Sequence, residues 1–440
     1  MNPIFEYGEW LKVANNGELK SHLRNIWHQR SIGQEEKESI EGIDNHYQPF
    51  LQFDDDMIRA NNYVGFIQNG NELIEIYPKV FKNLLPTDKA LMLRHIFYWF
   101  SYCRKWRFPF TQASLEPNYI DKFPELIIHL IATQFLETVS ERPLMQYQIQ
   151  EESLTTPRGS INFSRYINQS ASKGNFHKLE CDHEPFLFDN KVNRVIKYCT
   201  RLLLPQTSLS ENQKLLRETL FILDEVEDIP YSLNDISIIS LNSFYDDYNL
   251  IIDLCKTIIE QQIYSNHTYD LSQWCLLFPM EYIFEDFVAG FLQKHFCSQW
   301  HVEYQKSNAY LTTKPEAFQM QHDIFLTSRD GSERKIIIDT KYKIRDYSDT
   351  DKKKGVSQSD LYQVVSYAYR RGVSEVILIY PNASEEIKSI DTFDIPSGFE
   401  SNQIIHVKVV EVPFWSLANF TSLDENLKSM FKSLMKMNSR

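Results

Sequence analysis

The stretch from Gln321 to Gly372 constrains the fold more than any other part of the chain. It contains two short β-type runs, with Gly331 in the turn between them, and then a helical pattern. Asp323 lies in the first run, and Asp339 directly follows the apolar core of the second. This order predicts a β-hairpin that brings two carboxylates to one end, followed by a helix.

Lys341 adds a positive charge to the same end of the hairpin. Because alternate residues of a strand face the same side, Asp339 and Lys341 point the same way, whereas Thr340 points away and offers a metal only its carbonyl. Hard oxygen ligands hold Mg²⁺, which activates water and neutralises charge on a phosphate. The residue types favour metal-dependent phosphodiester cleavage, with Asp323 and Asp339 as ligands and Lys341 beside the attacking water. An Asp-x-Lys triplet alone is weak evidence, because charged residues at a strand edge are far more often solvated side chains or an ordinary ion pair.

The helical pattern that follows carries Gln363 and Tyr367 one turn apart, so the two side chains share a face. We expect Gln363 to lie nearer the metal. Val364, Val365 and Ala368 are then expected to pack toward the sheet or an adjoining helix.

These parts resemble the PD-(D/E)xK nuclease superfamily, with Asp323, Asp339 and Lys341 as its core and Gln363-x-x-x-Tyr367 as its QxxxY helix. Two positions depart from the pattern, because His322 stands in place of Pro and the second acid is Asp rather than Glu. The resemblance implies an αβββαβ core.

Glu285 lies in a helical pattern that begins near Pro279. By analogy with the helix acid of the superfamily, Glu285 is expected to orient water or complete the metal shell. A role as an ordinary surface glutamate is the alternative.

The composition is that of an ordinary soluble protein, with 42% hydrophobic and 24% charged residues among 440, enough for two or three domains. No run of eighteen apolar residues predicts a membrane helix, and the opening residues lack the basic segment of a secretory signal. The six cysteines form no C-x-x-C pair, so we expect buried thiols and a cytoplasmic protein.

The net charge of −13 is unevenly distributed. Residues 271–440 contain 22 acids and 20 bases, so residues 1–270 carry a net charge of −11. The segment from Arg334 to Lys354 has eight bases and four acids, ending in Lys352-Lys353-Lys354. This basic run suits phosphate contact, and a solvated loop explains it equally well.

The expected fold class is a multidomain α+β or α/β protein in three parts. Residues 1–85 form a β-rich domain with a hairpin at Tyr63–Tyr77 around Asn69-Gly70. Residues 86–270 form a mainly helical region with a β segment near 146–166, and residues 271–440 form the nuclease domain.

Several collinear motifs extend the resemblance over residues 60 to about 385. They are YVGFIQNGNELIEIYPKVF, Pro157–Ile161, Leu187–Lys197 and the C-terminal nuclease block. Together they resemble the McrC family, the nuclease subunits of McrBC modification-dependent restriction systems, which act in phage defence.

The McrC resemblance implies a set of partners and cofactors. The expected partner is a hexameric AAA+ GTPase of McrB type that recognises 5-methylcytosine, docked through residues 1–85. The expected substrate is double-stranded DNA and the expected metal Mg²⁺, with Mn²⁺ as an alternative. GTP or ATP would act only through the partner, because the chain has no G-x-x-x-x-G-K-[ST] motif. Dimerisation of two nuclease domains would suit a duplex break.

Two other functions compete with this interpretation. One is a noncatalytic assembly factor that activates a ring NTPase, and the other a nuclease acting on RNA or branched DNA without a motor. The intact set of charged residues favours catalysis over the assembly-factor function. The acidic first 270 residues suit contacts with protein rather than with phosphate, which counts against the motor-free nuclease.

Overall fold

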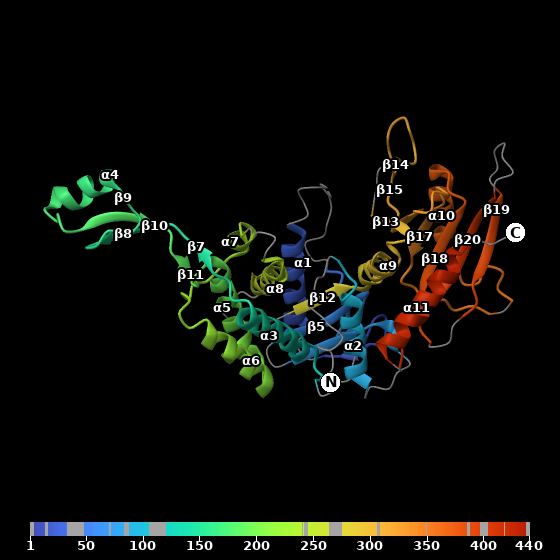
Figure 1. The fold of residues 1–440 in the computed structure, drawn as a ribbon. Helices are drawn as coiled ribbons and strands as arrows, with labels where there is room; N and C mark the ends of the chain where they lie inside the picture. Colours follow the sequence, from blue (N-terminus) through green and yellow to red (C-terminus); the bar gives the residue numbers. More distant parts are fainter. Residues whose placement is uncertain are drawn as a thin grey trace. The chain divides into compact units, whose positions relative to one another are not determined.

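A computed structural model describes most of the chain and divides it into two compact units (Figure 1). The first unit is made of residues 1–123 and 273–440, and the second of residues 124–272. The described ranges are 4–13, 16–32, 48–69, 72–82, 88–104, 120–239, 241, 245–263, 275–305, 309–348, 350–384, 388–396, 404–417 and 419–436. This division differs from the three expected segments, because the two ends of the chain share one unit.

A four-stranded sheet joins those two ends. Its order is β1 (Ile4–Phe5), β6 (Glu72–Tyr77), β5 (Tyr63–Asn69) and β12 (Cys275–Pro279). The predicted hairpin is confirmed as β5 and β6, whose register pairs Asn69 with Glu72, while Gly70 of the expected turn lies outside the described residues. Gly65 has φ +140°, and a Cβ there would lie 1.9 Å from the Leu276 carbonyl oxygen. Glycine therefore allows β12 to pair with β5.

The N-terminal segment is less purely β than expected. It contains helix α1 (Asn16–Ile32) beside a small sheet of β2 (Leu11–Lys12), β4 (Met57–Ala60) and β3 (Leu51–Asp54). The side chains of the β5–β6 hairpin are largely buried, including Phe66 and Ile76. Little of the described part of this hairpin is therefore available for a partner.

Aromatic helices connect the N-terminal segment to the C-terminal one within the first unit. Helix α2 (Lys89–Phe100) follows a short turn, η1 (Lys79–Phe81), and its Trp99 ring stacks on Phe414 at 3.9 Å. The Trp99 indole N–H also donates to the Phe414 carbonyl at 2.8 Å. Helix α9 (Met280–Phe296) packs against α2. His95 of α2 is also buried there.

A six-stranded sheet dominates the C-terminal segment. Its order is β13 (Trp300–Tyr304), β16 (Ile324–Ser328), β17 (Lys335–Thr340), β18 (Glu375–Asn382), β20 (Ile404–Pro413) and β19 (Asp391–Pro396). The first three strands are antiparallel neighbours, whereas β17, β18 and β20 are parallel. A two-stranded hairpin, β14 (Ala309–Tyr310) and β15 (Gln319–Met320), precedes β16.

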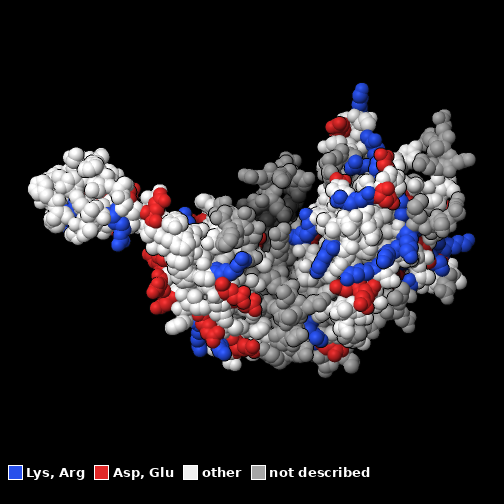
Figure 2. Space-filling view, viewed as in Figure 1, with Lys and Arg blue, Asp and Glu red and all other residues white. Residues whose placement is uncertain are grey.

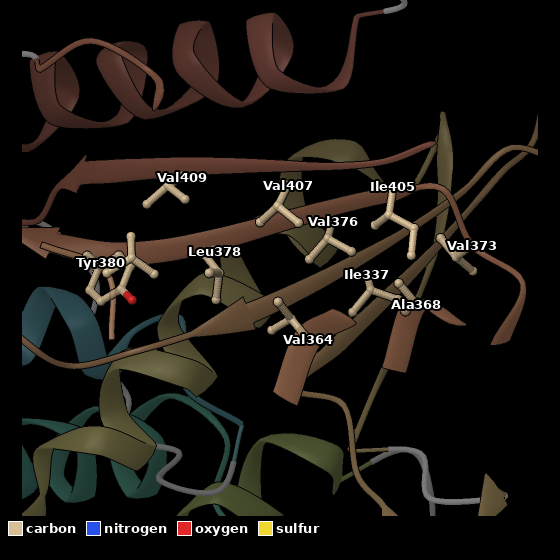
Figure 3. Close-up of a cluster of buried hydrophobic side chains, with 11 residues drawn as sticks. Ile337, Val364, Ala368, Val373, Val376, Leu378, Tyr380, Ile405, Val407 and Val409 are labelled. Atoms are coloured by element: carbon tan, nitrogen blue, oxygen red, sulfur yellow. The ribbon is translucent and has the colours of Figure 1, made fainter. Parts of the chain in front are cut away.

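Two helices cover this sheet. Helix α10 (Gln358–Arg371) places Val364 and Ala368 in a buried cluster with Ile337, Leu378 and Val407 from the strands (Figure 3). Val365 packs against the same cluster, so the predicted inner face of this helix is confirmed. Helix α11 (Phe420–Met435) packs against β20.

The second unit is mainly helical, as expected. Its helices are α3 (Phe123–Glu141, with Phe123 in the first unit), α5 (Lys191–Leu203), α6 (Ser210–Ile222), α7 (Leu233–Ser237) and α8 (Asp246–Ile263). Asn190 caps α5 by accepting from the backbone N–H groups of Val192 and Asn193, and its amide donates to the Leu144 carbonyl.

The β segment of the second unit forms two small sheets. One contains β8 (Gln150–Leu154), β10 (Leu179–His183) and β9 (Ser160–Ile161), and the other pairs β11 (Phe186–Leu187) with β7 (Gln146–Tyr147). Residues 163–170, partly expected as strand, form α4 (Phe163–Arg165) and a π-helical turn. Among the described residues, no helix is long and apolar enough to cross a membrane.

Candidate active site at the end of strand β17

Strands β16 and β17 form the predicted hairpin and bring Asp323 close to Asp339. Ile324 pairs with Ile338 across the hairpin, so the residues next to them in each strand face one another. Gly331 lies in the connecting turn with φ +82°. The hairpin part of the expected arrangement is confirmed.

Thr340 contributes more to this end of the hairpin than expected. Its backbone N–H and its hydroxyl both donate to Asp323 Oδ2, at 2.7 and 2.8 Å. The Thr340 side chain, expected to point away from the site, therefore orients the Asp323 carboxylate, while its carbonyl as a metal ligand stays a prediction. Burial raises the pKa of Asp323, and the two Thr340 hydrogen bonds oppose that rise.

Asp339 is a buried carboxylate that lies beside the Lys341 ammonium. It is 1% exposed, and its Oδ2 lies 2.7 Å from Lys341 Nζ. Burial and the nearby Asp323 charge raise the pKa of Asp339 to about 7, although Lys341 acts in the opposite direction. Asp339 Oδ1 has no hydrogen-bond partner among the described residues. A desolvated carboxylate with an unpaired oxygen is costly unless a ligand occupies it.

Helix α10 supplies two further groups of the predicted set. Lys341 Nζ donates to Gln363 Oε1 at 3.1 Å, and Gln363 Nε2 donates to the Tyr367 hydroxyl at 2.8 Å. Burial lowers the pKa of Lys341, but Asp339 and Asp323 outweigh burial and raise it overall. Lys341 is therefore a cation held between an acid and an amide.

Asp360 and Lys343 adjoin this set and were not identified from the sequence. Lys343 Nζ lies 2.9 and 3.0 Å from the two Asp360 carboxylate oxygens, and the Tyr380 hydroxyl donates to Asp360 at 3.3 Å. In the sequence, Asp360 has the position of a helix-capping acid, three residues after Ser357. The Ser357 hydroxyl accepts from the Asp360 backbone N–H. The pKa of Asp360 is lowered, since its hydrogen bonds to Lys343 and Ser357 outweigh burial.

Glu285 is linked to Asp323 indirectly, through Gln305. Its Oε1 accepts from Gln305 Nε2 at 2.8 Å, and the Gln305 backbone N–H donates to the Asp323 carbonyl at 3.1 Å. Glu285 and Gln305 line a pocket of about 300 Å³ together with Arg104 and Tyr304. The structure thus places Glu285 where it supports the segment before β16.

His322, at the position of the superfamily proline, is a buried neutral side chain. Its Nε2 accepts from Arg371 Nε at 3.0 Å, and its ring lies 5.0 Å from that of Tyr367. Burial and the Arg371 charge lower the pKa of His322 to about 4. His322 therefore packs between the hairpin and α10 rather than carrying charge.

The oxygen donors at the end of β17 are of the type that a divalent cation such as Mg²⁺ requires. Within the described ranges, no three His, Cys, Asp or Glu residues are grouped so that they could hold a metal together, so Glu285 does not join the two aspartates in such a group. Mg²⁺ is commonly bound by one or two carboxylates, with waters and substrate phosphates completing its shell. Asp323 and Asp339, with the unpaired Asp339 Oδ1, fit that requirement.

The basic loop after β17 is anchored to the sheet. Arg345, 4% exposed, donates to the Lys354 carbonyl at 3.0 Å and to Asp391 at 2.7 Å. Lys352 and Lys353 remain exposed. Lys and Arg side chains gather over the C-terminal part of the visible face, whereas acidic side chains line much of the helical unit (Figure 2).

Comparisons with known proteins place this chain in a family. Residues 58–381 match the family model described as McrBC 5-methylcytosine restriction system component. No curated protein matches the chain.

Solved structures similar to the chain include two from Thermococcus gammatolerans. One is a refined half-complex from a tetradecameric assembly of Thermococcus gammatolerans McrB AAA+ hexamers with bound McrC, with TM-score 0.73, 16% identity, and coverage of 98% of this chain and 99% of that chain. The other, the Thermococcus gammatolerans McrBC complex, gives TM-score 0.52, 17% identity, and coverage of 67% and 87%. These likenesses show a shared fold, and the family match covers most of the sequence. The chain belongs to the family of McrBC 5-methylcytosine restriction system components.

Proposed function

We propose that this chain is the Mg²⁺-dependent DNA endonuclease subunit of a two-component McrBC-like restriction system. The observation that carries the proposal is the buried Asp339 carboxylate, unpaired at Oδ1 and placed between Asp323 and Lys341. The order α9, β13, β16, β17, α10, β18 supports a PD-(D/E)xK core. This chemistry belongs to the first unit alone.

The residues have distinct roles in this proposal. Asp323 and Asp339, with the Thr340 carbonyl, would hold Mg²⁺ or Mn²⁺. The metal supplies charge neutralisation at the scissile phosphate and activation of water. Lys341 places its ammonium beside the attacked phosphate, where it stabilises developing negative charge. Gln363 holds Lys341 in place, and Tyr367 holds Gln363.

The proposed partner is a hexameric AAA+ GTPase of McrB type, and the proposed substrate is double-stranded DNA. The support is the family match and the likeness to the McrC-containing assembly of Thermococcus gammatolerans. The partner would supply GTP or ATP hydrolysis and the recognition of modified DNA. Docking through residues 1–85 stays a prediction, and the buried β5–β6 strands leave that role to other surfaces of the segment. Dimerisation through the nuclease segment also stays a prediction.

One reconstitution separates this function from the noncatalytic alternative. The full chain is mixed with its AAA+ partner, the nucleotide, Mg²⁺ and methylated duplex DNA, and both cleavage and nucleotide hydrolysis are measured. We expect cleavage that EDTA and Asp323→Ala abolish, while Asp323→Ala still stimulates hydrolysis by the partner. Stimulated hydrolysis without any cleavage by the wild-type chain would establish the assembly-factor function instead.

A further inference from the structure

Tyr342, the residue after Lys341, reaches away from the candidate site into the N-terminal sheet. Its side chain is buried, and its hydroxyl donates to Glu6 Oε2 at 2.8 Å. Glu6 follows strand β1 and is 1% exposed. A hydrogen bond thus joins residues 336 positions apart in the sequence, directly behind the catalytic lysine of the proposed function.

Lys79 closes this contact from the other side. Its backbone N–H donates to the same Glu6 oxygen at 3.0 Å, and its Nζ donates to the Tyr342 carbonyl at 2.7 Å. The Lys79 ammonium also lies 4.2 Å from the centroid of the Tyr342 ring, within the range of a cation–π interaction. Tyr342 is therefore held at its carbonyl, its ring and its hydroxyl.

The neighbours of Tyr342 are fixed in other directions. Lys341 points to Asp339 and Gln363, while Lys343 pairs with Asp360. The Lys341 backbone N–H donates to the Ile379 carbonyl at 2.8 Å, and the Lys343 N–H donates to the Lys341 carbonyl at 2.7 Å. A rotation or shift of Tyr342 would therefore move the backbone that carries the Lys341 side chain.

The chemistry of this contact is unusual for a purely structural one. Glu6 is buried, and its Oε1 has no hydrogen-bond partner among the described residues. Buried charged groups cost desolvation energy, and apolar residues of similar volume often serve stability equally well. A buried acid and a half-buried lysine that specify one tyrosine geometry next to a reactive group therefore indicate a positioning role.

We propose that Glu6 and Lys79 are positioning residues of the nuclease, which hold Tyr342 and thereby fix Lys341 beside the acid pair. This inference rests on the proposed function of the β17 site. It makes the N-terminal sheet part of the nuclease, so residues 271–440 alone would lack the contact that sets their catalytic lysine. Neither Glu6 nor Lys79 touches the reacting groups themselves.

The test uses the full chain with its AAA+ partner and follows single-turnover cleavage of duplex DNA. Tyr342→Phe keeps the ring and removes the hydroxyl, and we expect its cleavage rate to fall about tenfold, because small displacements of catalytic groups have large rate effects. Glu6→Ala should lose at least as much. Glu6→Gln should recover most of the rate, because its amide oxygen still accepts from Tyr342 and Lys79.

A matched control distinguishes positioning from stability. Tyr98 is a buried tyrosine of the same unit whose hydroxyl donates to Asp424, away from the β17 site. Tyr98→Phe should lower the thermal midpoint at least as much as Tyr342→Phe does, yet cleave at the wild-type rate. In a Lys341→Ala background, followed over long incubations, adding Tyr342→Phe should cause no further loss.

The possible outcomes separate the two proposals. Wild-type cleavage by Tyr342→Phe and Glu6→Ala, or an equal loss in Tyr98→Phe, overturns the positioning role and leaves the nuclease function in place. An undiminished Tyr342→Phe effect in the Lys341→Ala background overturns it as well. Absence of cleavage by the wild-type chain with an active partner overturns both proposals.

Discussion

Two groups of charged side chains, one in each unit, look alike in sequence and differ in chemistry. In the second unit, Glu180 and Asp182 alternate on β10 and meet Arg165, much as Asp339 and Lys341 alternate at the end of β17. Ser170 donates to Glu180 at 2.7 Å, and Asn162 donates to Asp182 at 3.1 Å. These hydrogen bonds, together with Arg165, lower the pKa of both acids.

The acid at β17 has the opposite surroundings. Burial raises the pKa of Asp339 to about 7, and its Oδ1 has no partner among the described residues. Charged residues placed together therefore do not by themselves mark a reactive site. A shortage of donors around a buried carboxylate is the more informative property, because it leaves the oxygen available to a ligand.

The largest expected effect separates the two groups by activity. Asp339→Asn should lower single-turnover DNA cleavage by at least about 10³-fold, equivalent to about 4 kcal/mol of transition-state stabilisation. Asp182→Asn should change that rate less than about threefold, because its carboxylate is satisfied within its own unit. Near wild-type cleavage by Asp339→Asn would remove the β17 site from the mechanism.

Replacement of the basic residue should lower the cleavage rate in the β17 group and leave it unchanged in the β10 group. Lys341→Ala removes the ammonium that faces Asp339, and we expect a loss of about 10²-fold in cleavage at saturating DNA. Arg165→Met should lower the thermal midpoint and leave the rate of the cleavage step unchanged. The comparison fails if the two variants show equal losses in single-turnover rate.

The pH dependence of stability should have opposite signs in the two groups. Because the folded pKa of Asp339 is about 7, the folded protein retains a proton there that the unfolded chain loses near pH 4, so stability falls as pH rises through this window. In metal-free buffer at pH 8, Asp339→Asn should therefore be more stable than the wild type by on the order of 2 kcal/mol. That advantage should disappear toward pH 4.

Asp182→Asn is the matched variant for this measurement. The lowered pKa of Asp182 contributes stability above the unfolded pKa, and this contribution is lost as pH falls through the folded value. The variant should be less stable than the wild type at pH 8 and approach it at low pH. Urea unfolding at several pH values measures both differences, and equal signs would contradict the assigned surroundings.

The smallest expected effect concerns the support of Lys341. Gln363→Ala removes the amide that accepts from Lys341 Nζ and should lower cleavage about tenfold, with DNA affinity unchanged. Gln358→Ala is a control on the same helix, since the Gln358 amide donates to the exposed Tyr362 hydroxyl. If Gln363→Ala cleaves at the same rate as Gln358→Ala, the Gln363 amide does not contribute to cleavage and Lys341 needs no support from α10.

The sequence alone predicted the local elements of the candidate site. The apolar run before Asp339, the glycine turn and the i, i+4 spacing of Gln363 and Tyr367 each act over a few residues, so the hairpin and α10 follow from periodicity and turn chemistry. The β5–β6 hairpin around Asn69 followed for the same reason.

Only the tertiary structure decided which distant segments complete the site and how the chain divides. The pairing of β12 with β5 and the Tyr342–Glu6 hydrogen bond join groups that no local pattern relates. The surroundings of the two acids also depend on long-range packing. Nothing in the local sequence distinguishes Asp339 from Asp182, but packing removes water from Asp339 and supplies hydrogen-bond donors to Asp182. The periodicity of the sequence determines on which face of a strand or helix a residue lies, whereas long-range packing determines which groups that face contacts.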